Sequence, residues 1–229
     1  MKRELGTIAS IVILILILAA KTGFLHDVIG PGPAKSIQYY CELEMQFKGE
    51  NCQDIGYKAS SGDDSYRQIK NVLTKVYGSL FDKNLQGIHL SSDQVNQIVE
   101  ARMKAQEKVS IRTEEVFKDG SNAKVKVTVG YIPNVQILTE TDVVVNEAVK
   151  GPCASMNSQE ADRYLADLLT RTLVEKYKNF APGDTKSVVV DCIKDTKYHC
   201  WKPVNETATD KILDNIVVGN KVETSSGNS

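Results

Sequence analysis

Apolar residues recur every three to four positions in four segments of the chain, which is the spacing of one face of an α-helix. These segments are residues 36–48, 63–80, 91–106 and 158–180. Aspartate or serine at the start of the second and third segments is typical of a helix N-cap, and Pro182 with Gly183 ends the fourth. The pattern predicts four helices, of which the last is the longest.

The polar and apolar positions change to a strand-like pattern in the middle and near the end of the chain. The runs KVSIRTEEVF and AKVKVTVGYI flank the turn-forming residues KDGSN, which predicts a β-hairpin. The run TDVVVNEAV, residues 141–149, predicts a further β segment. SVVVDCI and YHCWKPV, on either side of KDTK, predict a final hairpin.

The order of these elements indicates the fold class. Three helices, a hairpin, a strand, a long helix and a second hairpin favour an α+β domain. Its helices are expected to pack on one face of a curved antiparallel sheet.

The N-terminus has a pattern of a different kind. Lys2 and Arg3 precede sixteen uncharged residues, Leu5 to Ala20, dominated by Ile and Leu. Such a segment is an anchor or a signal peptide. We favour a retained single-pass anchor, with the N-terminus cytoplasmic and the domain extracytoplasmic, because Leu18 fits poorly into a signal-peptidase site ending at Ala20. Cleavage and secretion is the alternative.

These boundaries divide the chain into four parts. Residues 1–25 form the anchor segment, which contacts the membrane through residues 5–25, and residues 26–34, with the sequence GPGP, form a stiff linker. Residues 35–205 form the α+β domain. Residues 206–229 form a tail that is expected to be disordered after 219, with a short docked helix from an apolar stripe around Leu213.

Composition and charge narrow the choice of partners. The 229 residues include 28 Lys and Arg against 29 Asp and Glu, with the two signs interspersed, so nucleic acid is not expected as a partner. The chain lacks a phosphate loop, a dinucleotide fingerprint, a His-Glu-x-x-His motif and a Gly-x-Ser-x-Gly motif. We therefore expect no cofactor, no bound metal and no catalytic activity.

Five cysteines are the remaining candidates for chemistry. If the last hairpin turns about Thr196, Cys192 lies opposite Cys200, and an oxidising compartment favours a cross-strand disulfide over free thiols, a metal site or a redox catalyst. Cys41 and Cys52 form a second plausible pair, although five cysteines allow fifteen ways to form two bridges. Cys153 is expected to be a buried thiol.

Several stretches carry a resemblance to a known group of proteins. YYCELEMQFKGENCQDIGYK, SYRQIKNVLTKVYGSLF, EEVFKDGSNAKVKVTV and YHCWKPV resemble bacterial extracytoplasmic lipoproteins with a domain of unknown function. The resemblance implies a cystatin-like or nuclear-transport-factor-like fold and a location in the cell envelope. LAAK, residues 18–21, is similar to a lipobox, but Lys21 stands where the lipid-bearing cysteine is required.

Two classes of function are compatible with this pattern. One is a membrane-anchored binding or scaffolding domain of the bacterial cell envelope, which the absence of catalytic motifs favours. The other is a small-molecule pocket protein or enzyme on the same sheet, with Tyr131, Tyr164 and Trp201 as candidate lining residues.

Overall fold

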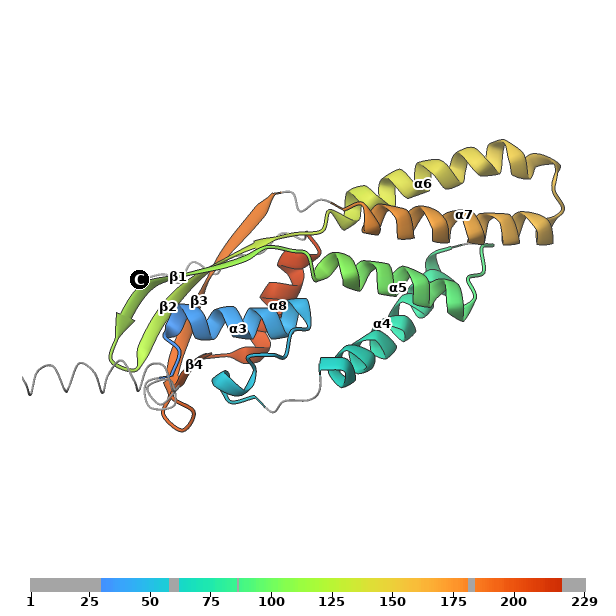
Figure 1. The fold of residues 1–229 in the computed structure, drawn as a ribbon. Helices are drawn as coiled ribbons and strands as arrows, with labels where there is room; N and C mark the ends of the chain where they lie inside the picture. The colour runs from blue at the N-terminus through green and yellow to red at the C-terminus, as the bar shows by residue number, and fades with distance from the viewer. Residues whose placement is uncertain (1–29, 58–61, 86, 181–183, 220–229) are drawn as a thin grey trace, which may run out of the picture.

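The computed structural model describes residues 30–57, 62–85, 87–180 and 184–219, and the anchor segment lies outside these ranges. Figure 1 shows a long curved sheet at one end and a group of helices at the other. The helices are α3 (Pro33–Gln46), α4 (Gly62–Asn84), α5 (Ser92–Gln106), α6 (Asn134–Lys150), α7 (Ser158–Lys178) and α8 (Glu206–Val217), with short 3-10 turns η1 (Gln53–Ile55) and η2 (Pro152–Ser155). The strands are β1 (Ile111–Asp119), β2 (Asn122–Gly130), β3 (Thr185–Asp195) and β4 (Cys200–Pro203).

The sheet is antiparallel throughout, with the strand order β1-β2-β3-β4. The first hairpin closes through a two-residue turn in which Gly120 has a φ of 54°, a conformation that glycine adopts without strain. An irregularity in β1 between Glu115 and Phe117 shifts the register by one residue. The predicted hairpin and the α+β fold class are both confirmed.

One face of the sheet is buried and the other faces solvent, because side chains alternate along each strand. In β2, Ala123, Val125, Val127 and Val129 are buried, whereas Lys124 and Lys126 are exposed. α3 and α8 pack on the buried face, and α3 contributes Ile37, Tyr40 and Cys41 to the core. Burial of this apolar face is the main source of the domain's stability.

α4, α5, α6 and α7 form a helical arm that extends beyond the sheet (Figure 1). α5 and α7 pack against each other, α4 packs beside α5, and α6 packs beside α7. Capping boxes define the N-termini of α5 and α7. The Ser91 hydroxyl accepts a bond from the Gln94 backbone N–H, and the Asn157 side-chain carbonyl accepts a bond from the Glu160 backbone N–H. α4, with 23 residues, is longer than α7, with 21, so the predicted order of helix lengths is wrong.

The strand predicted at residues 141–149 is wrong, because this run lies inside α6. The buried residues of α6 include Ile137, Thr141 and Ala148, which are spaced for one helical face packed on α7. The Thr141 hydroxyl donates to the Ile137 carbonyl at 2.7 Å, which satisfies this buried side chain within the helix. Helix packing therefore overrides the strand preference of the β-branched residues.

The last hairpin is confirmed, but its register is not the predicted one. Pro203 lies opposite Cys192, and Asp195 lies opposite Cys200. The direct opposition of Cys192 and Cys200 is therefore wrong. The loop consists of residues 196–199, so its centre lies after Thr196. The Asp195 carboxylate stabilises this loop by accepting bonds from the backbone N–H groups of Lys197 and Tyr198.

The folded domain extends past residue 205. α8 is capped by Asn205, whose side chain accepts from the Ala208 N–H at 3.0 Å. The Leu213, Ile216 and Val217 side chains are at most 1% exposed, so this helix is a part of the core. Residues 220–229, for which disorder is predicted, lie outside the described ranges.

Candidate functional site

An apolar groove of about 560 Å³ runs along the helical arm, a volume within the range of small-molecule sites. α4 forms one wall and α6 the other, while side chains of α5 and α7 lie between them. The lining residues are mostly aliphatic and aromatic: Tyr77, Leu80, Phe81, Leu85, Ile98, Asn134, Val135, Leu138, Asp142, Leu173, Tyr177 and Val218. We call this cavity the apolar groove.

The rim of the apolar groove exposes large hydrophobic side chains. Val135 is 70% exposed, Leu138 46% and Leu80 48%. The apolar stripe of α4 therefore leaves Leu80 at the surface. Val76 and Val72 continue the exposed stripe along α4, at four-residue spacing. Clustered apolar side chains at a concave surface are typical of a binding site.

One end of the apolar groove carries hydrogen-bonding groups. The Tyr177 hydroxyl donates to the Asn134 side-chain carbonyl at 3.1 Å, and Tyr77 lines the same end. Burial raises the pKa of Tyr177, and the neighbouring Tyr77 adds to this, so the hydroxyl is protonated and able to donate.

A buried arginine lies beside Tyr77 at this end. Arg102 is 7% exposed, and its guanidinium carbon lies 5.6 Å from the centre of the Tyr77 ring. Its Nη1 donates to Gln106 Oε1 at 3.2 Å, whereas its Nε is buried without a hydrogen-bond partner. Burial raises the pKa of Tyr77, and the charge of Arg102 and a hydrogen bond to it act in the opposite direction.

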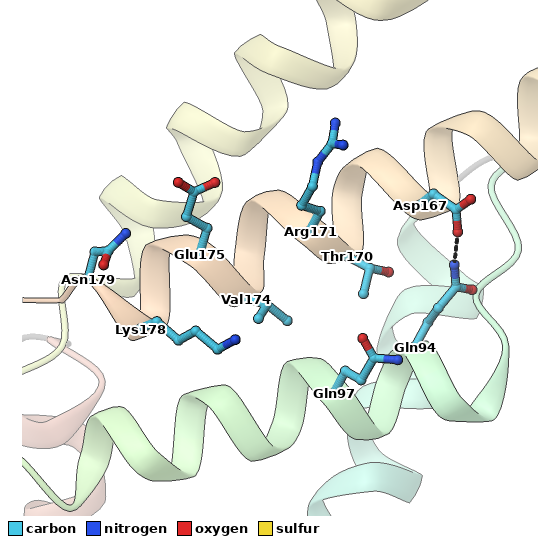
Figure 2. Close-up of a pocket in the computed structure, with 9 residues that line it drawn as sticks. All are labelled: Gln94, Gln97, Asp167, Thr170, Arg171, Val174, Glu175, Lys178 and Asn179. Atoms are coloured by element: carbon cyan, nitrogen blue, oxygen red, sulfur yellow. Dashed lines mark hydrogen bonds between the residues drawn. The ribbon is translucent and has the colours of Figure 1, made fainter.

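A second, more polar groove of about 400 Å³ lies between α5 and α7. Figure 2 shows its lining, in which the Gln94 amide donates to Asp167 Oδ1 at 2.8 Å across the two helices. The charged residues at its edge are of both signs: Arg171 and Lys178 stand with Asp167 and Glu175 on α7. This mixture favours hydration over selection of one ligand charge, and the groove has no aromatic platform.

The three aromatic residues predicted to line a pocket do not converge. Trp201 is 4% exposed in the main core, where its backbone N–H donates to the Ser36 hydroxyl at 3.1 Å. Tyr164 lies on α7 and is 36% exposed. Tyr131 follows β2, with the Lys186 amine 4.9 Å from its ring centre. None of the three lines the apolar groove, whose aromatic residues are Tyr77, Phe81 and Tyr177.

All five cysteines lie within the described residues, and all are buried free thiols. Burial raises the pKa of Cys192 to about 12 and that of Cys200 to about 11. Burial, with a contribution from the adjacent Cys192, also raises the pKa of Cys41. Since the thiolate is the nucleophile, these three side chains are poorly reactive in the folded state. Cys52 and Cys153 are buried as well.

The described residues, 30–57, 62–85, 87–180 and 184–219, bear on metal binding and on membrane spanning. Within these ranges, no three or more His, Cys, Asp and Glu side chains are grouped so as to hold a metal ion. No helix in the same part of the chain combines the length and apolar character that a bilayer span requires. The hydrophobic run at residues 5–20 lies outside this part.

Comparison with known proteins extends the description of the fold. No protein-family model and no curated protein matches the chain. Its structure is similar to the crystal structure of ycdA from Bacillus subtilis subsp. subtilis str. 168, a protein provisionally assigned as a lipoprotein. The match has a TM-score of 0.54 and 16% sequence identity, and it covers 81% of this chain. This likeness shows the fold alone. The chain spans about half, 55%, of the ycdA structure.

Proposed function

We propose that this chain is a membrane-tethered protein of the bacterial cell envelope whose extracytoplasmic domain binds an apolar ligand and has no catalytic activity. The uncharged run from Leu5 to Ala20 after Lys2 and Arg3 supports the tether and its orientation. The fold that the chain shares with ycdA supports a location in the cell envelope. We also propose a relation to cystatin-like and nuclear-transport-factor-like domains, which the packing of α3 on an antiparallel sheet supports.

The apolar groove is the observation that carries this proposal. It combines a volume of about 560 Å³ with a lining in which only Asp142 is charged. The hydrogen-bonding groups gather at one end, where Asn134 and Tyr177 meet. This combination of an apolar body and few convergent polar groups is typical of ligand sites. Nucleophilic or acid–base catalysis needs a reactive group there, and the hydroxyls of Tyr77 and Tyr177 are held protonated.

The proposal is tested with the full chain held in amphipol, free of detergent, and the uncharged fluorescent probe N-phenyl-1-naphthylamine. We expect saturable binding, which Leu138→Trp weakens by about 10-fold because the larger side chain fills the groove. Val143→Trp is the matched control: Val143 is on the same helix, is 53% exposed against 46% for Leu138, and does not line the groove. Binding that fails to saturate, or that both variants weaken equally, would overturn the proposal.

The tether is tested separately in cells. External protease should remove the domain from intact cells after wall removal, and the chain should sediment with membranes. An intact cytosolic chain would contradict the proposed extracytoplasmic location. The measurement of probe binding to the apolar groove would remain valid.

A further inference from the structure

The position of Arg102 points to the chemistry of the ligand. Arg102 stands one helical turn from Ile98 on the same face of α5, and Ile98 lines the apolar groove. The guanidinium carbon of Arg102 lies 5.6 Å from the centre of the Tyr77 ring, and Tyr77 itself lines the groove. The buried cation therefore lies next to Tyr77, at the end of the groove that Tyr177 and Asn134 also line.

This arginine is not neutralised by a carboxylate. No ion pair joins Arg102 to an acidic side chain in the described ranges, and its Nε is buried with no partner. Asp214 on α8 is the acidic group that its charge reaches: burial and Asp210 raise the pKa of Asp214, and Arg102 opposes them. A buried cation without a paired anion is destabilising, and an anion bound near it would offset this cost.

The groove has polar groups at one end and an apolar body between its ends. Tyr77 and Leu85 on α4 are eight residues apart, as are Asn134 and Asp142 on α6. At 1.5 Å per residue both walls run for about 12 Å. Aliphatic side chains line the middle, and Asp142 stands exposed at the end away from Asn134. A ligand with a single polar head and a linear apolar chain matches this arrangement.

We propose that the apolar groove binds a single-chain carboxylate, with its head group at Tyr77, Tyr177 and Asn134 in front of Arg102 and its hydrocarbon chain directed toward Leu85. The proposal rests on the proposed function and specifies the ligand class of the same groove. A cationic head is disfavoured by the positive charge of Arg102 beside Tyr77. A head group without charge would leave the buried cation unpaired.

The test compares ligands that differ only in their head group and its charge. Three amphiphiles of equal chain length, dodecanoate, dodecan-1-ol and dodecyltrimethylammonium, displace N-phenyl-1-naphthylamine from the full chain in amphipol, each below its critical micelle concentration. We expect dodecanoate to bind about 10- to 100-fold more tightly than the alcohol, which is the range for a hydrogen bond to a charged group. The cation should bind least tightly.

Variants then assign the selectivity to Arg102. Arg102→Gln should abolish the preference for dodecanoate and leave the affinity for dodecan-1-ol unchanged. Lys104→Gln is the matched control, because it removes one positive charge from the same helix at a side chain that is 61% exposed. Tyr177→Phe is a second variant, which should weaken the binding of dodecanoate several-fold. This result remains informative even if Arg102→Gln does not fold.

The outcomes separate the two proposals. If the probe binds but the three amphiphiles displace it equally, or if Arg102→Gln and Lys104→Gln have the same effect, the carboxylate proposal is wrong and apolar ligand binding stands. If the probe itself does not bind, both proposals fail.

Discussion

The Ser36 side chain links three parts of the domain, and its removal should be costly. Its hydroxyl donates to the Pro31 carbonyl at 3.1 Å and accepts a bond from the Trp201 backbone N–H at 3.1 Å. Ser36 is fully buried and Trp201 is 4% exposed, so water cannot replace either bond without opening the core. β4 pairs with β3 on one side, and Ser36 supplies a partner for an N–H on its other edge.

Ser36→Ala removes both bonds and leaves a buried N–H and a buried carbonyl unpaired. Each net hydrogen bond contributes about 1 kcal/mol, and an orphaned buried group costs about 1–3 kcal/mol. We expect a loss of about 2–3 kcal/mol in the free energy of unfolding. For a domain of this size this corresponds to a fall in Tm of about 5–10 °C.

The measurement is urea unfolding of a fragment that lacks residues 1–30, which we expect to be soluble and folded. The m-value should be unchanged, because the variant alters stability and not the surface exposed on unfolding. Ser187→Ala is the matched control: its hydroxyl lies 2.8 Å from that of Thr128 on the exposed face, and its loss should change stability by less than about 0.5 kcal/mol. If Ser36→Ala is no more destabilising than Ser187→Ala, the argument from the unpaired groups is refuted.

Three further predictions follow from burial and charge. Cys192 and Cys200 should resist alkylation at pH 8 in the folded domain, because burial raises the pKa of both thiols. Both thiols should react after denaturation. A 192–200 disulfide in peptide maps would contradict the observed register. Burial, followed by Asp210, raises the pKa of Glu44 from 4.5 to about 6, so the folded state loses stability as pH rises from about 4.5 to 6. Glu44→Gln should therefore be more stable above pH 6, by less than about 1 kcal/mol because the carboxylate is partly exposed, and equal to the parent below pH 4.5 in thermal melts. Truncation after Asn205 removes α8 with the buried Leu213 and should lower stability by several kcal/mol, and an unchanged Tm would show that α8 is not part of the core.

Local patterns predict most of the elements correctly because their causes are local. The capping box at Ser91 and the Gly120 turn depend on residues within a few positions, so they can be identified without the rest of the fold. Residues 141–149 are the exception. Their β-branched side chains favour a strand, but burial of Ile137, Thr141 and Ala148 against α7 makes a helix the more stable state.

The candidate site could not be predicted in the same way, because its residues are contributed by separate helices. Tyr77 and Leu80 fit a core stripe within α4, and nothing in that stripe shows that Leu80 lines an open groove with α6. The aromatic residues selected from the sequence, Tyr131, Tyr164 and Trp201, are those near strands or on an amphipathic helix. The structure distributes them over the surface and the core.

The amino-acid sequence by itself determines most of the helices and strands, which strand faces are apolar, and that a hydrophobic run precedes the domain, because these properties arise from periodicity and local sterics. Only the tertiary structure decides the register that separates Cys192 from Cys200, the helical state of residues 141–149, and the burial of Arg102 beside Tyr77. Each of these depends on contacts between residues far apart in the chain, and their energies exceed the preferences of the individual segments.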